Sequence, residues 1–261
     1  MQQYLHLLRD IYENGRPKHP TRSESGATKN DTVGLANLHF SHDLQMGFPL
    51  LTTRRLHWRG LVGELRSFLE GRENEHDFAA NGCNFWKPWA KSDGDLGPVY
   101  GSQWLRGGQL EHILKCLRDR PTDRRMVASA WIPDEISKMV LPPCHLLWVV
   151  TPYDNRLNLS WIQRSCDFPV GVPYNIASYA LLTHILAKWA GMVPGNIDCI
   201  FCDAHIYRNQ LDGVREQLAR LPLHPPSVNV SFTDPDYFLS WSVELVNWNP
   251  MDNISFGELE V

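Results

Sequence analysis

Residues 175–191 read NIASYALLTHILAKWAG, the stretch with the clearest helical pattern in the chain. Its apolar side chains recur at α-helical spacing: Ile176, Tyr179, Ala180, Ile185, Leu186 and Trp189. Asn175 is a suitable N-cap residue, and Gly191 follows where the helix would end. Strand-like segments stand on both sides, NLSWIQRS at 158–165 and NIDCIF at 196–201. A long helix between strands predicts a domain that combines helices with sheets.

The rest of the chain extends this mixed pattern. Further helices are expected at 2–13, 60–70 and 108–119, and further strands at MVASAW (126–131), HLLWVV (145–150) and PSVNVSF (226–232). Residues 16–33 are polar and rich in turn formers, which predicts a loop. The sequence contains no repeat, low-complexity tract or linker. We therefore expect one α+β domain over residues 1–261, with mixed β-sheets packed against helices.

Composition narrows the class of protein. Of the 261 residues, 43% are hydrophobic and 21% charged, which suits a folded globule, and the net charge is −4. That charge argues against a general nucleic-acid or membrane binder, so an anionic ligand would need a local arginine cluster. The N-terminus lacks a signal-peptide pattern, and no apolar run has the roughly 18 residues needed to cross a bilayer. Six cysteines are too few for a disulfide scaffold. We expect reduced thiols and a cytoplasmic protein.

Cys144 lies in LPPCHLLW, residues 141–148. A single cysteine is most often a small hydrophobic core residue. Two prolines before it restrict the backbone, however, and His145 follows it. Such an approach suits a thiol held at a cleft, where nearby positive charge would favour the thiolate. Both a core residue and a nucleophile remain open at this point.

Arginines gather at Arg124 and Arg125, and at Arg164 beside Ser165, with Arg22 in the polar loop. Guanidinium groups pair with phosphate in a bidentate manner. Because Arg164 falls in a strand-like stretch, its charge must be satisfied, either by a phosphate ligand or by a structural carboxylate.

Other polar residues each have two interpretations. Glu64 lies within the helix at 60–70, on a buried face or on a solvated one. Cys199 and Cys202 form a lone C-x-x-C in a strand pattern, which we interpret as core and not as a zinc or redox site. His205 and Tyr207 stand two residues apart, so both would point to one side of a strand. We expect no metal site.

Taken together, seven segments resemble the thymidylate synthase family, in the family's order and over almost the whole chain. They are GFPLLTTRR (47–55), GELRSFLEG (63–71), GDLGPVYGSQW (94–104), DRRMVASAW (123–131), LPPCH (141–145), IQRSCDFPVGVPYNIASYALL (162–182) and DAHIYRNQ (203–210). The resemblance implies that the Cys144 thiolate attacks C6 of dUMP. C5 then becomes nucleophilic and takes the one-carbon unit of 5,10-methylenetetrahydrofolate, a co-substrate.

The resemblance also implies a role for each matching residue. For the nucleotide, Arg22, Arg164 and Ser165 correspond to phosphate ligands, Asn175 to the side chain that reads N3 and O4 of uracil, and His205 and Tyr207 to the groups on the 3′-hydroxyl. Arg124 and Arg125 correspond to a pair that reaches the other subunit's site, which implies a sheet-mediated homodimer. Glu64 corresponds to the carboxylate that organises water for proton transfer, within a network of Tyr100, His145 and Gln163. Trp86, Asp167, Gly171 and Val261 match the folate site, with Asp167 also among the catalytic set.

The sequence departs from the family pattern in two loops, at Ile132 and in the C-terminal segment. The loop after Arg22 (SESGATKNDT) is longer, the loop after Trp104 is trimmed, and Ile132 replaces an asparagine. The C-terminal segment reads NPMDNISFGELEV, which lacks the usual His-Pro and Lys and adds Glu258 and Glu260. In the family this tail closes over the substrates and excludes water, so that hydride reduces the transferred carbon.

These departures leave the product open. We favour dTMP, the product of a synthase. The alternative is 5-hydroxymethyl-dUMP, the product of the deoxyuridylate hydroxymethylases of bacteriophages, in which water replaces hydride. A third hypothesis, a non-catalytic or RNA-binding family member, is disfavoured because Glu64, Cys144, Arg164 and Asn175 are all retained.

Overall fold

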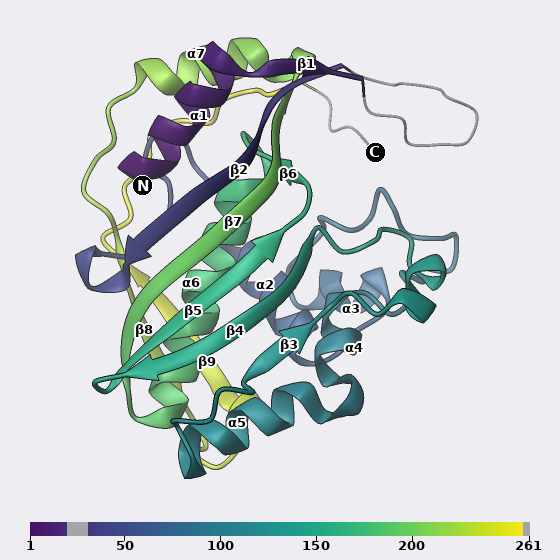
Figure 1. Cartoon of the computed structure of the whole chain (residues 1–261), viewed down its shortest axis with the longest axis vertical. Helices are drawn as coiled ribbons and strands as arrows, with labels where there is room; N and C mark the ends of the chain where they lie inside the picture. The colour runs from purple at the N-terminus through teal and green to yellow at the C-terminus, as the bar shows by residue number, and fades with distance from the viewer. Residues whose placement is uncertain (20–30, 258–261) are drawn as a thin grey trace.

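The computed structural model describes residues 1–19 and 31–257. The helices are α1 (Gln2–Asn14), α2 (Trp58–Leu69), α3 (Glu75–Ala80), α4 (Tyr100–Leu105), α5 (Gln109–Asp119), α6 (Gly171–Ala190) and α7 (Leu211–Ala219). The strands are β1 (Arg16–Lys18), β2 (Thr32–Asp43), β3 (Val127–Ser129), β4 (His145–Tyr153), β5 (Arg156–Gln163), β6 (Cys166–Asp167), β7 (Val193–Tyr207), β8 (Ser227–Phe232) and β9 (Trp241–Val246). Figure 1 shows their arrangement.

Within these residues, a seven-stranded sheet runs in the order β1-β2-β7-β5-β4-β3, with β6 paired to β7. β7 is parallel to β5 and β6, and the remaining neighbours are antiparallel. β8 and β9 form a separate antiparallel ribbon. The mixed sheet and its covering helices confirm the α+β prediction.

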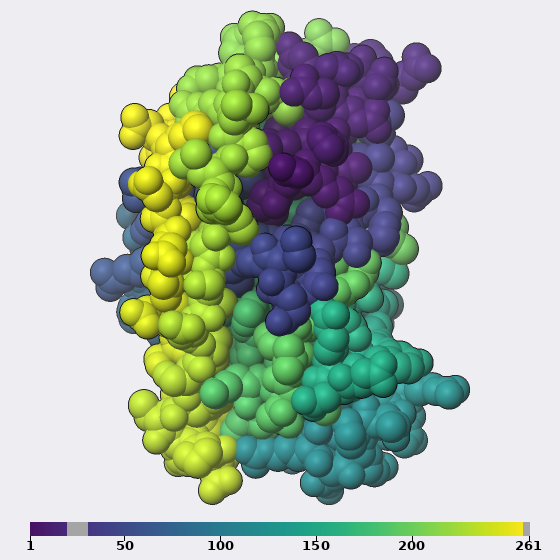
Figure 2. Space-filling model, turned by 90° about the vertical axis from the view of Figure 1, so that its left-hand side faces the viewer, coloured from purple at the N-terminus to yellow at the C-terminus, as the bar shows by residue number. Residues whose placement is uncertain are grey.

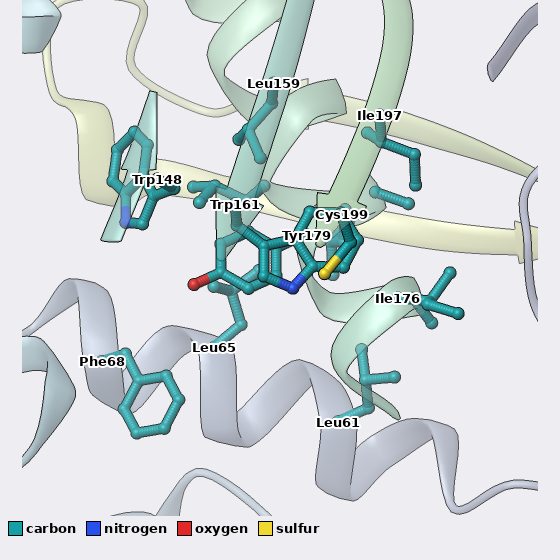
Figure 3. Packing of buried hydrophobic residues seen from close by; sticks show 14 of the residues in the cluster. Leu61, Leu65, Phe68, Trp148, Leu159, Trp161, Ile176, Tyr179, Ile197 and Cys199 are labelled. Atoms are coloured by element: carbon teal, nitrogen blue, oxygen red, sulfur yellow. The ribbon is translucent and has the colours of Figure 1, made fainter. Parts of the chain in front are cut away.

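Helices cover one face of the sheet and leave the other face uncovered. Directly paired residues share a face, so Phe40, Cys199, Trp161 and Trp148 form one row across β2, β7, β5 and β4. All four are buried, and Figure 3 shows Trp148, Trp161 and Cys199 above residues of α2 and α6. In Figure 1, α2 and α6 lie behind the sheet, whereas the central strands are uncovered on the side facing the viewer.

Helix α6 is the central packing element. It is apolar on all sides, as expected of a helix enclosed by its neighbours, here α2 and the sheet. The prediction that Asn175 caps it is wrong, because the helix begins four residues earlier, at Gly171, with Val170 as N-cap. Pro173 lies in the first turn, where its missing N–H costs no helical hydrogen bond. Gly191 ends the helix in the left-handed conformation (φ 67°), as predicted.

The remaining predictions hold to differing degrees. The helices expected at 2–13, 60–70 and 108–119 are confirmed to within two residues. The loop prediction for 16–33 is wrong at both ends, where β1 and the start of β2 lie. β2 was not predicted because its side chains lack clear alternation, and Asn37, at φ 59°, interrupts its pairing. No helix in the described part of the chain combines the length and apolar character needed to cross a bilayer.

Substitution in α6 tests its role as the core element. Ile185 is fully buried, so Ile185→Ala removes three carbons from a closely packed site. We expect the free energy of unfolding to fall by about 2–5 kcal/mol in urea denaturation. Lys188→Gln, at an exposed position of the same helix, should change it by no more than about 1 kcal/mol. Equal losses in the two variants would contradict the central position of α6.

Candidate active site

Cys144 lies one residue before β4 and is partly exposed. Its peptide is held on both sides. The Cys144 N–H donates to the Tyr100 hydroxyl at 2.7 Å, and its carbonyl accepts from the Arg164 N–H at 2.7 Å. Pro142 and Pro143 restrict the chain that leads to it. The thiol is therefore presented from a fixed backbone at the edge of the core.

Arg164 follows the last residue of β5 and supports the cysteine segment. Its Nε donates to the Pro143 carbonyl at 2.8 Å and its Nη2 to the Pro142 carbonyl at 2.9 Å. The expectation of a phosphate or a carboxylate partner thus missed the backbone carbonyls, which satisfy much of this guanidinium. Ser165 is partly exposed beside it, at the same strand end.

Behind Cys144, three rings form a buried layer. The His145 and Tyr100 rings stack at 4.0 Å, and His145 Nδ1 lies 2.9 Å from the Tyr179 hydroxyl. Burial lowers the pKa of His145 to about 3, so the imidazole is neutral at physiological pH. Burial likewise raises the pKa of Tyr100 well above its ordinary value, with the neighbouring Cys144 adding to the effect. This layer therefore offers hydrogen bonds and no charge.

Glu64 projects from α2 toward the same region. Trp86 Nε1–H donates to its carboxyl at 2.9 Å, while loss of hydration raises its pKa to about 7. Glu64, His145 and Asn175 all line one small cavity of about 10 Å³, room for about one water molecule. The buried-face interpretation of Glu64 is supported. Trp86 itself is only 5% exposed and sits among aromatic rings.

Asn175 lies in the first turns of α6, next to Gln163 at the end of β5. Gln163 Nε2 donates to Asn175 Oδ1 at 3.0 Å and to the Ser165 carbonyl at 3.2 Å. The Trp161 indole N–H faces Gln163 Oε1 at 3.5 Å, which assigns the orientation of the Gln163 amide. With Oδ1 directed at Gln163, the Asn175 amide has a defined orientation at the cavity wall.

A second group gathers where β6 meets β7. Asp167 is paired with His205 in this parallel register, and Gly171 begins α6 nearby. The rings of His205 and Tyr207 meet at 5.2 Å, which confirms that they share one side of the strand. Burial raises the pKa of the Asp167 carboxyl, while His205, Arg54 and hydrogen bonds oppose that shift.

A larger cavity, of about 360 Å³, lies beside this group. Its walls are residues 54–57, the start of α6 at Val170 and Tyr174, and the C-terminal segment from Asn253 to Gly257. Phe256 is 8% exposed, and the Arg54 guanidinium lies 4.8 Å above its ring. Figure 2 shows the C-terminal residues, in yellow, along one side of the molecule. The tail up to Gly257 is thus packed against the body and forms a wall of the cavity.

The predicted arginine pair lies apart from this core. Arg124 and Arg125 are exposed just before β3, and Arg125 forms a bidentate ion pair with Asp123 (Nη2–Oδ2 2.7 Å, Nε–Oδ1 3.0 Å). This pairing holds the pKa of Asp123 well below its ordinary range.

Two cysteine clusters bear on metal binding. Cys199 of the C-x-x-C is in the core, as interpreted from sequence, whereas Cys202 is partly exposed and departs from that interpretation. In the described residues, His112, Cys116 and Asp123 also bring potential metal-ligand atoms within 4.8 Å of one another. Arg120 lies against Cys116 Sγ at 3.6 Å, and Arg125 occupies the Asp123 carboxylate. In this structure the Asp123 carboxylate of that cluster is therefore paired with arginine.

Comparison with protein families agrees with this geometry. The family described as thymidylate synthase matches residues 2–258 of the 261. The chain belongs to the thymidylate synthase family. Members of the family transfer a one-carbon unit to dUMP and use methylenetetrahydrofolate as co-substrate. The resemblance seen in the sequence is confirmed, and the chain is an enzyme of this methyltransferase type.

Arg22 and Val261, expected at the phosphate and folate sites, lie outside the described residues, as do Glu258 and Glu260. Sequence reasoning also missed Tyr179, Arg54 and Gln210, which contact the predicted residues. All three lie inside the matching segments 47–55, 162–182 and 203–210, and that location was the available signal.

The raised pKa of Glu64 predicts a pH-dependent stability. The folded protein holds the Glu64 proton between the ordinary pKa of 4.5 and the folded value of about 7, whereas the unfolded chain releases it. The stability that the protonated carboxyl contributes is present below pH 4.5 and lost as pH rises through 7. Glu64→Gln keeps an acceptor for Trp86 without the charge. Relative to the parent, it should gain about 1–3 kcal/mol between pH 4 and pH 8.5 in urea denaturation. If the difference in unfolding free energy between Glu64→Gln and the parent does not vary with pH, the raised pKa of Glu64 is contradicted.

Proposed function

We propose that this chain converts dUMP and 5,10-methylenetetrahydrofolate into dTMP and dihydrofolate, with Cys144 as the covalent nucleophile. One observation carries the proposal: the backbone-anchored Cys144 stands next to a layer of neutral hydrogen-bonding groups that borders the Glu64 cavity. A thiol in a fixed position beside groups that stabilise developing charge is the arrangement that covalent catalysis requires.

In the proposed chemistry, the Cys144 thiolate adds to C6 of uracil and the electron pair of the C5–C6 bond delocalises toward O4. C5 attacks the one-carbon unit, forming a carbon–carbon bond, and then loses its proton. Elimination of tetrahydrofolate leaves an exocyclic methylene, which takes a hydride from the departing folate. Expulsion of the thiolate gives dTMP. Glu64, with a pKa of about 7, is populated in both protonation states near neutrality, so it suits proton relay through a water in the cavity.

The nucleotide would lie along the strand ends that meet at Cys144. Asn175 is assigned to the uracil edge, where its amide offers both a donor and an acceptor. Arg164 and Ser165, with Arg22, are assigned to the phosphate, and His205 with Tyr207 to the 3′-hydroxyl. Gln163, Tyr100 and His145 support these contacts. The shared support of Cys144 and Arg164 through Pro142 and Pro143 favours this placement, because nucleophile and phosphate ligand then move as a unit.

The cavity of about 360 Å³ is our candidate site for the folate. Its volume is of the size that holds a small ligand. Arg54, Arg55 and His57 line it, and their basic side chains suit the glutamate carboxylates of a folate. Asp167 and Gly171 flank its α6 wall, and Val261 would follow from its tail wall. Trp86 lies deeper, so any stacking with the pterin would use only the small exposed part of its ring.

The rewritten tail supports the alternative product. Residues 253–257 form one wall of the proposed folate site, so the tail sequence bears directly on water access. If water reaches the exocyclic methylene before hydride does, the product is 5-hydroxymethyl-dUMP and tetrahydrofolate leaves unoxidised. The chain would then be a hydroxymethyltransferase of the bacteriophage type.

A product assay separates the two outcomes. Purified protein with dUMP and methylenetetrahydrofolate should yield dTMP by mass spectrometry, together with the absorbance rise of dihydrofolate. Cys144→Ala should lower the rate by at least about 10⁴-fold and abolish any covalent nucleotide adduct. A product 16 mass units heavier than dTMP, without dihydrofolate, would instead establish the hydroxymethylase. Full activity of Cys144→Ala would refute both.

We further propose that the uncovered sheet face forms a homodimer. The row opposite the buried one contains Leu147, Ile162 and Ile200, paired directly across β4, β5 and β7. Ile200 is 46% exposed, and Val127, on the neighbouring β3, is 37% exposed. A continuous apolar strip on a sheet face suits burial against a second copy. Arg124 and Arg125, just before β3, would then lie at the dimer boundary.

Mixing two inactive variants tests whether Arg124 and Arg125 act in the active site of the other subunit. One partner carries Cys144→Ala, and the other carries Arg124→Ala with Arg125→Ala; each alone should be nearly inactive. After co-refolding, a heterodimer contains one site with an intact cysteine and intact arginines, so about a quarter of all sites should recover. Recovery to about 25% of parent activity supports the crossing. No recovery, with dimers present in solution, would mean that the arginines act within their own subunit.

A further inference from the structure

We propose that Gln210 is a positioning residue that fixes the Asp167 carboxylate between strand β7 and the cavity assigned to folate. The inference rests on the proposed function, in which Asp167 contacts the folate. Nothing in the sequence pattern singled out Gln210. The inference comes from its contacts in the structure.

Gln210 ends the short 3₁₀ turn Arg208–Gln210 that follows β7, and it is only 1% exposed. Its Nε2 lies 3.1 Å from Asp167 Oδ1 and 3.3 Å from Oδ2. Its Oε1 accepts from the Tyr207 N–H at 3.0 Å. One buried side chain therefore connects the end of β7, where Tyr207 lies, with the carboxylate on β6.

The chemistry of the partners requires an amide here. The Tyr207 N–H can only donate and an ionised Asp167 can only accept, so the bridging group must offer an acceptor on one side and a donor on the other. Glutamine does both. A glutamate of the same shape would still accept from Tyr207 but would set a second carboxyl against Asp167, and a methionine would satisfy neither.

The surroundings make that donor important for Asp167. The charged and titratable groups around its carboxyl are Tyr4 from α1, Arg54 from the segment before α2, and His205 from β7. The Val170 N–H adds one hydrogen bond at 3.3 Å. Burial already raises the pKa of Asp167, and hydrogen bonds to the ionised form oppose that shift. Without the Gln210 donor, Asp167 would lose both a fixed orientation and part of its preference for ionisation.

The Gln210→Glu variant isolates this role because it keeps the size of the side chain and the acceptor for Tyr207. We expect the KM for methylenetetrahydrofolate to rise at least about tenfold, with the KM for dUMP changed less than about threefold. The acid limb of kcat/KM for the folate should move up by about one pH unit or more, since two adjacent carboxyls resist joint ionisation. Gln210→Met should raise the same KM without introducing a second titrating group.

Gln217→Glu is the matched control. Gln217 is fully buried in α7, and its Nε2 donates to the Thr53 hydroxyl at 3.3 Å and not to Asp167. It should lower the melting temperature while leaving the acid limb and the ratio of the two KM values unchanged. If Gln210→Glu behaves in the same way, Gln210 is merely structural and the inference is overturned.

Equilibrium binding measurements distinguish a failure of this inference from a failure of the proposed function. Binding of dUMP, and of folate in the presence of dUMP, is measured by calorimetry for the parent, Gln210→Glu and Gln210→Met. The inference predicts weaker folate binding in both variants with dUMP binding retained. A parent that binds neither ligand would refute the proposed function itself. A parent that binds both, with variants that bind folate equally well, would refute only the role of Gln210.

Discussion

The site depends on how the peptide of Cys144 is held. Its N–H and carbonyl are both bonded, to Tyr100 and to the Arg164 backbone, and the Arg164 side chain secures the two prolines before it. These contacts exist because β4 and β5 pair from His145 and Gln163 onward. That pairing is in turn held by the buried row containing Trp148 and Trp161. The position of one sulfur atom is therefore set by the packing of the whole sheet on α6.

Burial then determines which groups near the sulfur carry charge. His145 is neutral because its ring is enclosed, and Glu64 titrates near neutrality because its carboxyl has lost hydration against a single Trp86 donor. Cys144, at the edge of the core, thus lies beside the neutral His145 ring and near a Glu64 carboxyl that can take up or release a proton. Charge on this side of the molecule comes from arginines at the strand ends, which suits a substrate that is neutral at its ring and anionic at its phosphate.

Much of this arrangement could be predicted from the sequence, and the reasons for the failures are physical. Helices with a regular apolar face, such as α1 and α5, were found because one face alone is buried. β2 was missed because both of its faces are partly exposed and Asn37, at φ 59°, interrupts its pairing with β7. Glu64, His145 and Asn175 could be named from their motifs, but their shared cavity is created by segments distant in sequence. Gln210 became visible only through its contacts, since no spacing rule relates residue 210 to residue 167.

Strand β7 contributes residues to the core, to the uncovered face of the sheet and to the candidate active site. Cys199 faces the core, Ile200 faces the uncovered side, and His205 with Tyr207 reaches the site at the end of the strand. Alternation makes this possible, since adjacent residues serve opposite faces while the strand continues into the site. A dimer formed on the uncovered face, as proposed, would therefore contact the same strand whose end carries His205 and Tyr207, the residues that we assign to the 3′-hydroxyl. Because Gln210 hydrogen-bonds both the Tyr207 backbone and Asp167, a shift of the end of β7 would also move Asp167, which we assign to the folate. The fold thus connects the face proposed for the interface, through the end of β7 at Tyr207, to the Asp167 carboxylate by covalent and hydrogen bonds.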